Sequence, residues 1–326
     1  IRNSRFYDGK SSGITINKKS QATIEGCDIF RNSLFGIEIK ESNNIFISRC
    51  KVRNGRNVGI SISGKSEAQI ENCDIFKNVL TGIEIKGNST FNIRHSKIFN
   101  GKKSGIIFSE NSQGIVEDSD IFANTSIGIE IHDKSNPVIR KCRFFDGKDS
   151  GILIIKEGKG KVENCEIFCN YRAGIFITQG GNPVIKNSRI YEGKQSGIFI
   201  YKKGQGTIDD CEVFNNVLAG IEVRDNSKVT ILQCKISNGK GCGVLVAEKG
   251  QSSLENCNIF ENSFAGIEVR ENSSAIIKWC NINKNSDVGI WVDKRSSGTI
   301  ENCEITDNVS GPQRLEQGSK VVLLGV

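Results

Sequence analysis

Twelve cysteines in a chain of 326 residues are enough to suggest disulfide bonds or a metal site. Ten of them fall on one 23-residue register: Cys27, Cys50, Cys73, Cys142, Cys165, Cys211, Cys234, Cys257, Cys280 and Cys303. A zinc site needs ligands that converge on one point, whereas a fixed period sets them along a line, and the chain has only two histidines. We therefore expect a buried stack of free thiols in a reducing compartment, with no metal site and no cofactor. Cys169 and Cys242 lie off this register and stay unassigned.

Carboxylates are the next residues that could do chemistry. Acid–base hydrolysis of a polysaccharide needs two carboxyl groups that face one groove. Asp209 and Asp210 are the only adjacent aspartates, and successive residues of a strand point to opposite faces. The Asp-Pro-His-Asp motif of alginate epimerases and the Gly-His-Gly motif of polygalacturonases do not occur in the sequence. No insertion interrupts the repeat, so we expect that the chain is not an enzyme.

These residues must be positioned by a repeat of 23 residues. A glycine followed by Ile or Val recurs at this interval: Gly13, Gly36, Gly59, Gly82, Gly105, Gly128, Gly151, Gly174, Gly197, Gly220, Gly243, Gly266 and Gly289. Apolar residues alternate with polar ones after each glycine, which indicates short strands with one face inward. Leucine-rich repeats share the period, but here β-branched residues predominate and no segment has a helical period.

The sequence therefore predicts an all-β fold, a single-stranded right-handed parallel β-helix of the pectate-lyase-like type, with about thirteen coils of 23 residues. We expect it to occupy residues 1–311. Residues 312–326 leave the register and are expected to form a C-terminal tail that acts as an end cap. The chain has no methionine and starts in phase with the later coils, so its natural start is expected to be missing.

The corners and charges define a larger unit of 46 residues. Gly and Asn alternate at one corner, from Gly9 and Asn32 onward, which predicts a left-handed residue there. Opposite charges alternate from coil to coil, which weakens a nucleic-acid interpretation of the net charge of +7. A weak basic stripe does not alternate and recurs every 46 residues, and its central members are Lys102, Lys148, Lys194 and Lys240. We interpret this stripe as a solvated edge of the fold. The alternative, which we favour less, is that it attracts acidic binding partners.

One outward position departs from the pattern and predicts a binding surface. Glutamate is expected at the residue after Gly174 and Ile175, but Phe176 stands there. The candidate partner-binding residues on this face are Leu153, Ile155, Phe176, Phe199 and Tyr201. A contiguous apolar and aromatic patch on a repeat protein is typical of a binding site, although a loop, a missing domain or a second copy could cover it.

The amino-acid sequence of the repeat resembles that of a known family. The segments Ser135-Asn136-Pro137-Val138-Ile139-Arg140, Gly204-Gln205-Gly206-Thr207-Ile208-Asp209-Asp210 and Leu218-Ala219-Gly220-Ile221-Glu222-Val223 are similar to the right-handed (CASH-type) β-helix of the F-box only protein eleven family and related parallel β-helix repeat proteins. The resemblance implies substrate recruitment to a cullin–RING ubiquitin ligase and no catalytic residue.

We therefore expect a non-catalytic protein-recognition solenoid, the substrate-binding region of an F-box-type ubiquitin ligase adaptor. Its partner would be a protein or ubiquitination substrate, with no nucleic acid and no membrane, in the cytoplasm or nucleus. Two alternatives stay open: a carbohydrate-binding or polysaccharide-modifying β-helix (a lyase, hydrolase or epimerase), and a structural repeat scaffold.

Overall fold

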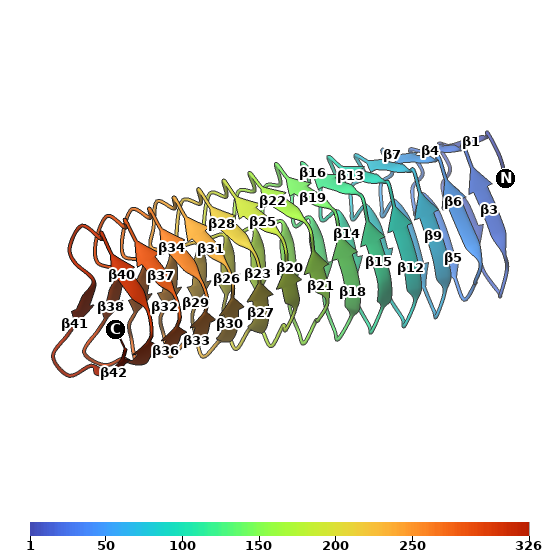
Figure 1. Ribbon diagram of the computed structural model, residues 1–326. Helices are drawn as coiled ribbons and strands as arrows, with labels where there is room; N and C mark the ends of the chain where they lie inside the picture. Colours follow the sequence, from blue (N-terminus) through green and yellow to red (C-terminus); the bar gives the residue numbers. More distant parts are fainter. Residues whose placement is uncertain (326) are drawn as a thin grey trace. The chain divides into compact units, whose positions relative to one another are not determined.

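The computed structural model describes residues 1–325 and contains only strands and turns over that range. The chain divides into two compact units, Ile1–Glu166 (unit 1) and Ile167–Val326 (unit 2). In both units each coil contributes three short strands, and equivalent strands of successive coils pair in parallel (Figure 1). We refer to the three resulting sheets as the first-strand, second-strand and third-strand sheets, in the order in which the chain visits them.

Unit 1 contains seven complete sets of three strands. Its first-strand sheet is formed by β1 (Arg5–Tyr7), β4 (Asp28–Phe30), β7 (Lys51–Arg53), β10 (Asp74–Phe76), β13 (Lys97–Phe99), β16 (Asp120–Phe122) and β19 (Arg143–Phe145). Its second-strand sheet is formed by β2 (Ile14–Ile16), β5 (Ile37–Lys40), β8 (Ile60–Ser63), β11 (Ile83–Ile85), β14 (Ile106–Phe108), β17 (Ile129–Ile131) and β20 (Ile152–Ile154). Its third-strand sheet is formed by β3 (Ala22–Glu25), β6 (Ile45–Ser48), β9 (Glu67–Glu71), β12 (Thr90–Arg94), β15 (Gln113–Glu117), β18 (Asn136–Arg140) and β21 (Lys161–Glu163). Strand β22 (Glu166–Phe168) spans the unit boundary.

Unit 2 repeats the same arrangement. Its first-strand sheet is formed by β25 (Arg189–Tyr191), β28 (Glu212–Phe214), β31 (Lys235–Ser237), β34 (Asn258–Phe260), β37 (Asn281–Asn283) and β40 (Glu304–Thr306). Its second-strand sheet is formed by β23 (Ile175–Ile177), β26 (Ile198–Ile200), β29 (Ile221–Val223), β32 (Val244–Val246), β35 (Ile267–Val269), β38 (Ile290–Val292) and β41 (Gln313–Leu315). Its third-strand sheet is formed by β24 (Val184–Lys186), β27 (Gln205–Asp209), β30 (Lys228–Leu232), β33 (Gln251–Glu255), β36 (Ser274–Lys278), β39 (Ser297–Glu301) and β42 (Lys320–Leu324).

The core of each unit consists of stacked β-branched side chains. In β26, Ile198 and Ile200 are fully buried while Phe199 between them is partly exposed, as period-two alternation predicts. Ile198 pairs in register with Ile221 of the next coil, 23 residues later. Burial of one such side chain contributes roughly 1.5–3 kcal/mol to the stability of the fold. A single coil could not bury its own inward side chains, because the neighbouring coils cover them. The predicted all-β parallel β-helix is therefore confirmed, with about 14 coils rather than thirteen.

The predicted left-handed corner is wrong by one residue. The positive φ angles belong to the residue before the Gly/Asn position, such as Asp8 (57°), Arg31 (56°) and Ala123 (52°). Asn32 instead connects two coils: its Nδ2 donates to the carbonyl oxygen of Phe6 at 3.1 Å, and its Oδ1 accepts from the amide of Gly9 at 3.0 Å. A Cβ atom at Gly9 would lie 2.9 Å from that Oδ1. The asparagine therefore occupies the space over the glycine, which explains the 46-residue unit.

The glycine that marks the repeat is required by close packing between coils. A Cβ atom at Gly197 would lie 2.6 Å from Cγ1 of Val213 and 2.7 Å from the carbonyl oxygen of Gly220. Both distances are shorter than a side-chain carbon can tolerate. The tail also differs from expectation, because β41 and β42 keep the 23-residue register with β38 and β39 and do not leave it.

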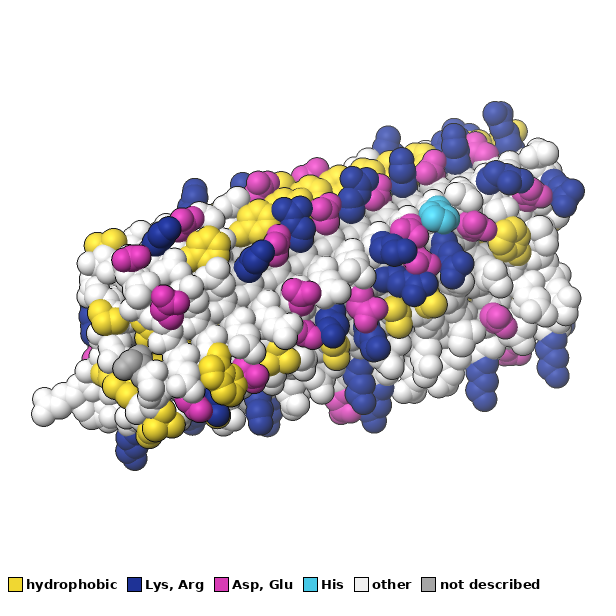
Figure 2. All heavy atoms as spheres, viewed as in Figure 1, with side chains coloured by type: hydrophobic (Ala, Val, Ile, Leu, Met, Phe, Trp, Pro, Cys, Tyr) yellow, Lys and Arg dark blue, Asp and Glu magenta, His cyan; other side chains and the backbone are white. Residues whose placement is uncertain are grey.

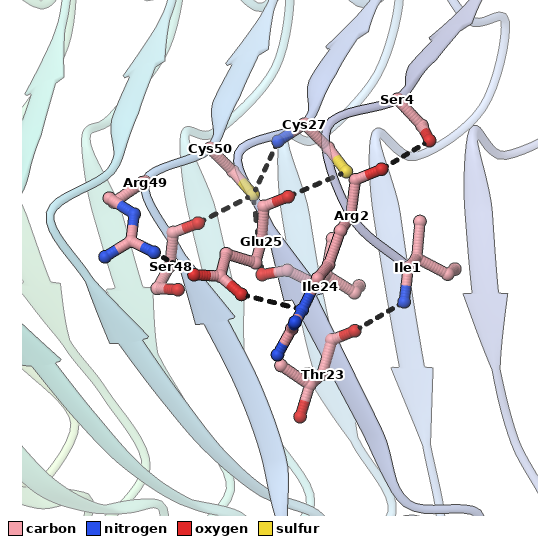
Figure 3. Close-up of polar contacts among 10 residues, drawn as sticks. All are labelled: Ile1, Arg2, Ser4, Thr23, Ile24, Glu25, Cys27, Ser48, Arg49 and Cys50. Atoms are coloured by element: carbon pink, nitrogen blue, oxygen red, sulfur yellow. Dashed lines mark hydrogen bonds and ion pairs between the residues drawn. The ribbon is translucent and has the colours of Figure 1, made fainter.

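The cysteine register forms a ladder at the tight turn between the third and first strands. At the start of the chain, Cys27, Cys50 and Cys73 are buried free thiols, as predicted. The Cys50 thiol donates to the carbonyl oxygen of Ser48 at 3.2 Å, and its Sγ accepts from the amide of Cys27 at 3.4 Å (Figure 3). Hydrogen bonding to Cys50 and burial together raise the pKa of the Cys73 thiol. The ladder therefore satisfies backbone groups at the turn, which is an architectural role.

Candidate functional site

The second-strand sheet of unit 2 carries three of the five predicted partner-binding residues. Phe176 of β23 and Phe199 of β26 stack with ring centroids 5.1 Å apart and planes 6° apart. Tyr201 lies beside Phe199, with centroids 5.6 Å apart. All three side chains are partly exposed. Leu153 and Ile155 are partly exposed in unit 1, where Leu153 pairs in register with Glu130, and their position relative to the three aromatic residues stays a prediction.

Charged groups follow the aromatic residues on the same sheet. Phe199 pairs in register with Glu222 of β29, a nearly buried side chain. Nε of Arg224 donates to Glu222 at 2.5 Å, and its Nη1 donates to Glu248 at 2.9 Å. The Ser196 hydroxyl donates to the second oxygen of Glu222. Two donors therefore fix the Glu222 carboxylate next to the aromatic residues.

A second glutamate lies two coils after the first. Leu245 of β32 separates Glu222 from Glu268 of β35 and is buried with Ala219, Cys242 and Ala247. Burial raises the pKa of the Glu268 carboxyl above its usual value, although the nearby Arg270 and Arg224 guanidiniums act in the opposite direction. Arg270 lies 3.2 Å from the Glu268 carboxylate. A carboxyl group with a raised pKa can donate a proton closer to neutral pH than an ordinary glutamate can.

The two glutamates lie on one face at a useful separation. Two layers at roughly 4.8 Å each put them about 10 Å apart. This exceeds the roughly 5 Å of a carboxylate pair that forms a covalent glycosyl intermediate, and lies just above the roughly 6.5–9.5 Å that accommodates a water molecule. We define Phe176, Phe199, Tyr201, Glu222, Arg224, Glu268 and Arg270 as the aromatic–acidic face. Its members lie on four coils, and the segment Gly-Ile-Glu-Val-Arg that supplies each Glu–Arg pair begins at Gly220 and again at Gly266.

Unit 1 carries a related pair on its own second-strand sheet. His132 Nε2 lies 2.8 Å from Oε2 of Glu130, and the Ser104 hydroxyl donates to the same carboxylate. Burial acts to raise the pKa of Glu130, but the hydrogen bonds from His132 and Ser104 outweigh it and hold that pKa below its usual value. Glu130 therefore differs from Glu268 and favours its charged form.

The first-strand sheet carries an aromatic ladder that the sequence reasoning missed. In unit 1 the rings of Phe76, Phe99, Phe122 and Phe145 stack 4.8–4.9 Å apart on the outer face. In unit 2 the rings of Phe168, Tyr191 and Phe214 stack 4.8–5.1 Å apart. Within each unit, Figure 2 shows a row of hydrophobic side chains bordered by basic and acidic side chains. The signal in the sequence is an aromatic residue every 23 positions at the end of the first strand.

The remaining predicted residues lie elsewhere. Lys102 and Lys148 are exposed in unit 1, and Lys194 and Lys240 are exposed in unit 2, and none of them is a member of the aromatic–acidic face as defined above. Cys169 occupies the left-handed corner position with φ of 54°, with Sγ 3.4 Å from the Glu192 carboxylate. Burial raises the pKa of the Cys242 thiol, which belongs to the apolar cluster beneath Leu245.

Comparison with known proteins supports the fold over the whole chain. The sequence matches the family described as right-handed beta helix region at residues 1–79, 35–184 and 173–324. Similar solved structures include the periplasmic alginate epimerase AlgG, at 14% identity and a TM-score of 0.64 over 88% of this chain and 76% of that one. The A-module of the Azotobacter vinelandii mannuronan C-5 epimerase AlgE6 is similar at 14% identity and a TM-score of 0.51, over 93% and 91% of the two chains.

These comparisons correct two expectations from the sequence. At such low identity the solved structures show a shared fold alone, but they include enzymes. The prediction that the chain is not an enzyme, which rested on its uninterrupted repeat, is therefore wrong. The finer resemblance to the F-box only protein eleven family is not confirmed, and no curated protein matches the chain. Residues 1–325 contain no helix long and apolar enough to cross a membrane. The chain belongs to the right-handed β-helix family.

Proposed function

We propose that the chain binds a carbohydrate polymer on the aromatic–acidic face of unit 2 and acts on it as a polysaccharide-modifying β-helix. The observation that carries this proposal is the continuity of Phe176, Phe199 and Tyr201 with the Glu222–Arg224 pair on one sheet. Ring edges offer apolar contact to the C–H groups of a sugar, while carboxylate and guanidinium groups bond its hydroxyls. A binding site that combines apolar walls with a few fixed polar groups is the usual arrangement for small polar ligands.

The repeat favours a polymer over a single sugar. Successive coils present equivalent outward positions at roughly 4.8 Å intervals, so an extended chain can contact several coils in sequence. Known structures of the same fold include enzymes that act on alginate, which supports a polysaccharide as the ligand class. The Asp-Pro-His-Asp motif of alginate epimerases is absent from this sequence, so the proposal does not extend to that reaction.

Glu268 is the proposed proton donor. Its raised pKa keeps a fraction of the carboxyl protonated at mildly acidic pH, and Glu222 lies on the same face about 10 Å away, estimated from two layers. Arg224 and Arg270, which pair with Glu222 and Glu268, would bind negatively charged groups or hydroxyls of the polymer.

Affinity electrophoresis of the intact chain in gels that contain neutral, acidic or sulfated polysaccharides tests the binding. We expect at least one polysaccharide to retard the chain, and the double variant Phe176→Glu, Phe199→Glu to lose that retardation. Trp279→Glu is the matched control, because Trp279 is an exposed aromatic residue of unit 2 in the turn between β36 and β37. Equal retardation of the wild type and the double variant would contradict the proposed face.

A further inference from the structure

Three glutamates on the outer face of the second-strand sheet accept a hydrogen bond from the preceding coil. The donor is a serine that directly precedes a glycine of the repeat, and the acceptor follows it by 26 residues. The bonded pairs are Ser12 with Glu38 at 3.2 Å, Ser104 with Glu130, and Ser196 with Glu222. The residue before the glycine, which we call the donor position, therefore acts on the ionisation of the glutamate in the next coil.

The donor position matches the outward residue that it serves. In unit 2 an alanine occupies it where the outward residue is apolar, in the pairs Ala173 with Phe199, Ala219 with Leu245, and Ala265 with Trp291. In unit 1 Val58 precedes Glu84, and that carboxylate instead accepts a hydrogen bond from Nζ of Lys86 at 3.1 Å. A hydroxyl at the donor position therefore goes with a glutamate that needs a donor from the preceding coil.

Cys242 occupies the donor position of Glu268, as Ser196 occupies that of Glu222. Both donor residues are buried. Burial raises the pKa of the Cys242 thiol, and the charges of Glu268 and Glu222 act in the same direction, so the thiol stays protonated. It donates to Glu268, but a thiol is a weaker donor than a hydroxyl. The Glu268 carboxylate therefore receives less stabilisation from the preceding coil than a serine would give it.

Glu130 of unit 1 shows the effect of a serine on an otherwise similar carboxyl group. The side chains of Glu130 and Glu268 are 15% and 13% exposed, and each lies beside a basic residue two positions later, His132 and Arg270. Burial acts to raise both pKa values, yet that of Glu130 is lowered and that of Glu268 is raised. Arginine is always charged and histidine is not, so the charge of the basic neighbour does not explain the higher pKa of Glu268. The donor position differs in the required direction.

The charged groups around Glu268 do not account for its raised pKa either. They come from its own coil, from the coil two before it and from the next coil: Arg270, Glu271, Arg224 and Asp293. Both arginines act to lower this pKa, and Glu271, which acts to raise it, has a smaller effect. Leu245 and Trp291 pair in register with Glu268 on either side and carry no charge. Burial therefore determines the direction, opposed by a thiol where Glu130 has a hydroxyl.

We propose that Cys242 is a positioning residue for the proton donor, because a thiol at the donor position withholds from Glu268 the hydroxyl that equivalent glutamates receive. The two glutamates of the aromatic–acidic face thereby take different roles, although both lie in the segment Gly-Ile-Glu-Val-Arg. The difference is one atom on the preceding coil, sulfur in Cys242 and oxygen in Ser196. The inference rests on the proposed function for the use of the proton, but the ionisation of Glu268 is measurable without a substrate.

Carboxyl-detected NMR titration of the intact chain, labelled with carbon-13 in glutamate, tests the proposal. The Glu268 resonance is assigned by its loss in Glu268→Gln. We expect Cys242→Ser to lower the pKa of Glu268 by about one pH unit, because a hydroxyl stabilises the carboxylate more than a thiol does. A change of less than about 0.3 pH units in the folded variant would overturn the proposal.

Two further variants separate the donor position from a general effect of polarity. Ala219→Ser places a hydroxyl in the same apolar cluster one coil earlier, where the outward residue is Leu245, and should leave the pKa of Glu268 unchanged. An equal fall in Ala219→Ser and Cys242→Ser would overturn the role of the donor position. The reciprocal variant Ser104→Cys in unit 1 should raise the pKa of Glu130, and an unchanged value would likewise overturn the proposal.

Retardation of the wild-type chain in polysaccharide gels is a separate measurement, so the two proposals can fail independently. A chain that binds no polysaccharide, but whose Glu268 pKa falls in Cys242→Ser, contradicts the proposed function and supports the effect of Cys242 on Glu268. A chain that binds polysaccharide, but whose Glu268 pKa is the same in both forms, supports the binding face and overturns the role of Cys242.

Discussion

The asparagine at every second corner is expected to be a major contributor to stability, and Asn216 allows this to be measured. Its Nδ2 donates to the carbonyl oxygen of Ile190 at 3.2 Å, and its Oδ1 accepts from the amide of Gly193 at 3.0 Å. The side chain is almost completely buried. Asn216→Ala removes both hydrogen bonds, worth about 1 kcal/mol each, and leaves the buried Gly193 amide without this partner at a further cost of up to about 2 kcal/mol. We therefore expect a loss of about 2–4 kcal/mol.

Hydrogen exchange at the Gly193 amide is the appropriate assay, since coils of a repeat protein can open locally and a single unfolding free energy is then ill defined. A loss of about 2–4 kcal/mol corresponds to exchange faster by about 30- to 1000-fold. The control is Asn182→Ala, because Asn182 is exposed and precedes Pro183 in the same unit. Exchange at Gly193 that changes less than about threefold in Asn216→Ala would refute the argument that the asparagine connects the coils.

Two further predictions concern close packing and pH. Gly197→Ala should lower the free energy of local opening around its coil by about 1–3 kcal/mol, measured by hydrogen exchange at the Ile198 amide, because the new Cβ meets Val213 and Gly220. Gly206→Ala, whose nearest contact would be 3.2 Å, should cost less by the same measurement, and equal costs would contradict the packing argument. Glu268→Gln should raise stability relative to the wild type at pH 7 but not at pH 4. The raised pKa means that the folded state loses stability as pH rises from the ordinary value of 4.5 through the folded-state pKa. A difference that does not vary between these pH values would contradict burial as the cause.

The inward residues could be predicted from the sequence because each coil gives them the same buried environment. Ile198, Ile221 and Val244 occupy equivalent buried positions in successive coils, so period and alternation alone identify the strands. The corner could not be predicted in the same way. Residues with no preference for positive φ, such as Ala123 and Arg31, take the left-handed conformation because the paired strands on both sides impose it. The side-chain bonds of the neighbouring asparagine reinforce that choice.

The outward positions carry the candidate sites. At these positions a residue type that repeats every 23 residues can have a structural role or a binding role, and the repetition does not distinguish the two. An aromatic residue such as Phe122 stacks on its neighbours and stabilises the register, so its repetition alone does not indicate a ligand. Information about binding lies in the coils that break the series. Phe176 replaces a glutamate and creates an aromatic pair with Phe199, while Ser237 replaces a ring and creates a cavity beside Phe214. In a solenoid in which every coil packs in the same way, a residue that departs from its outward series, as Phe176 does, is the strongest physical reason to look for a ligand.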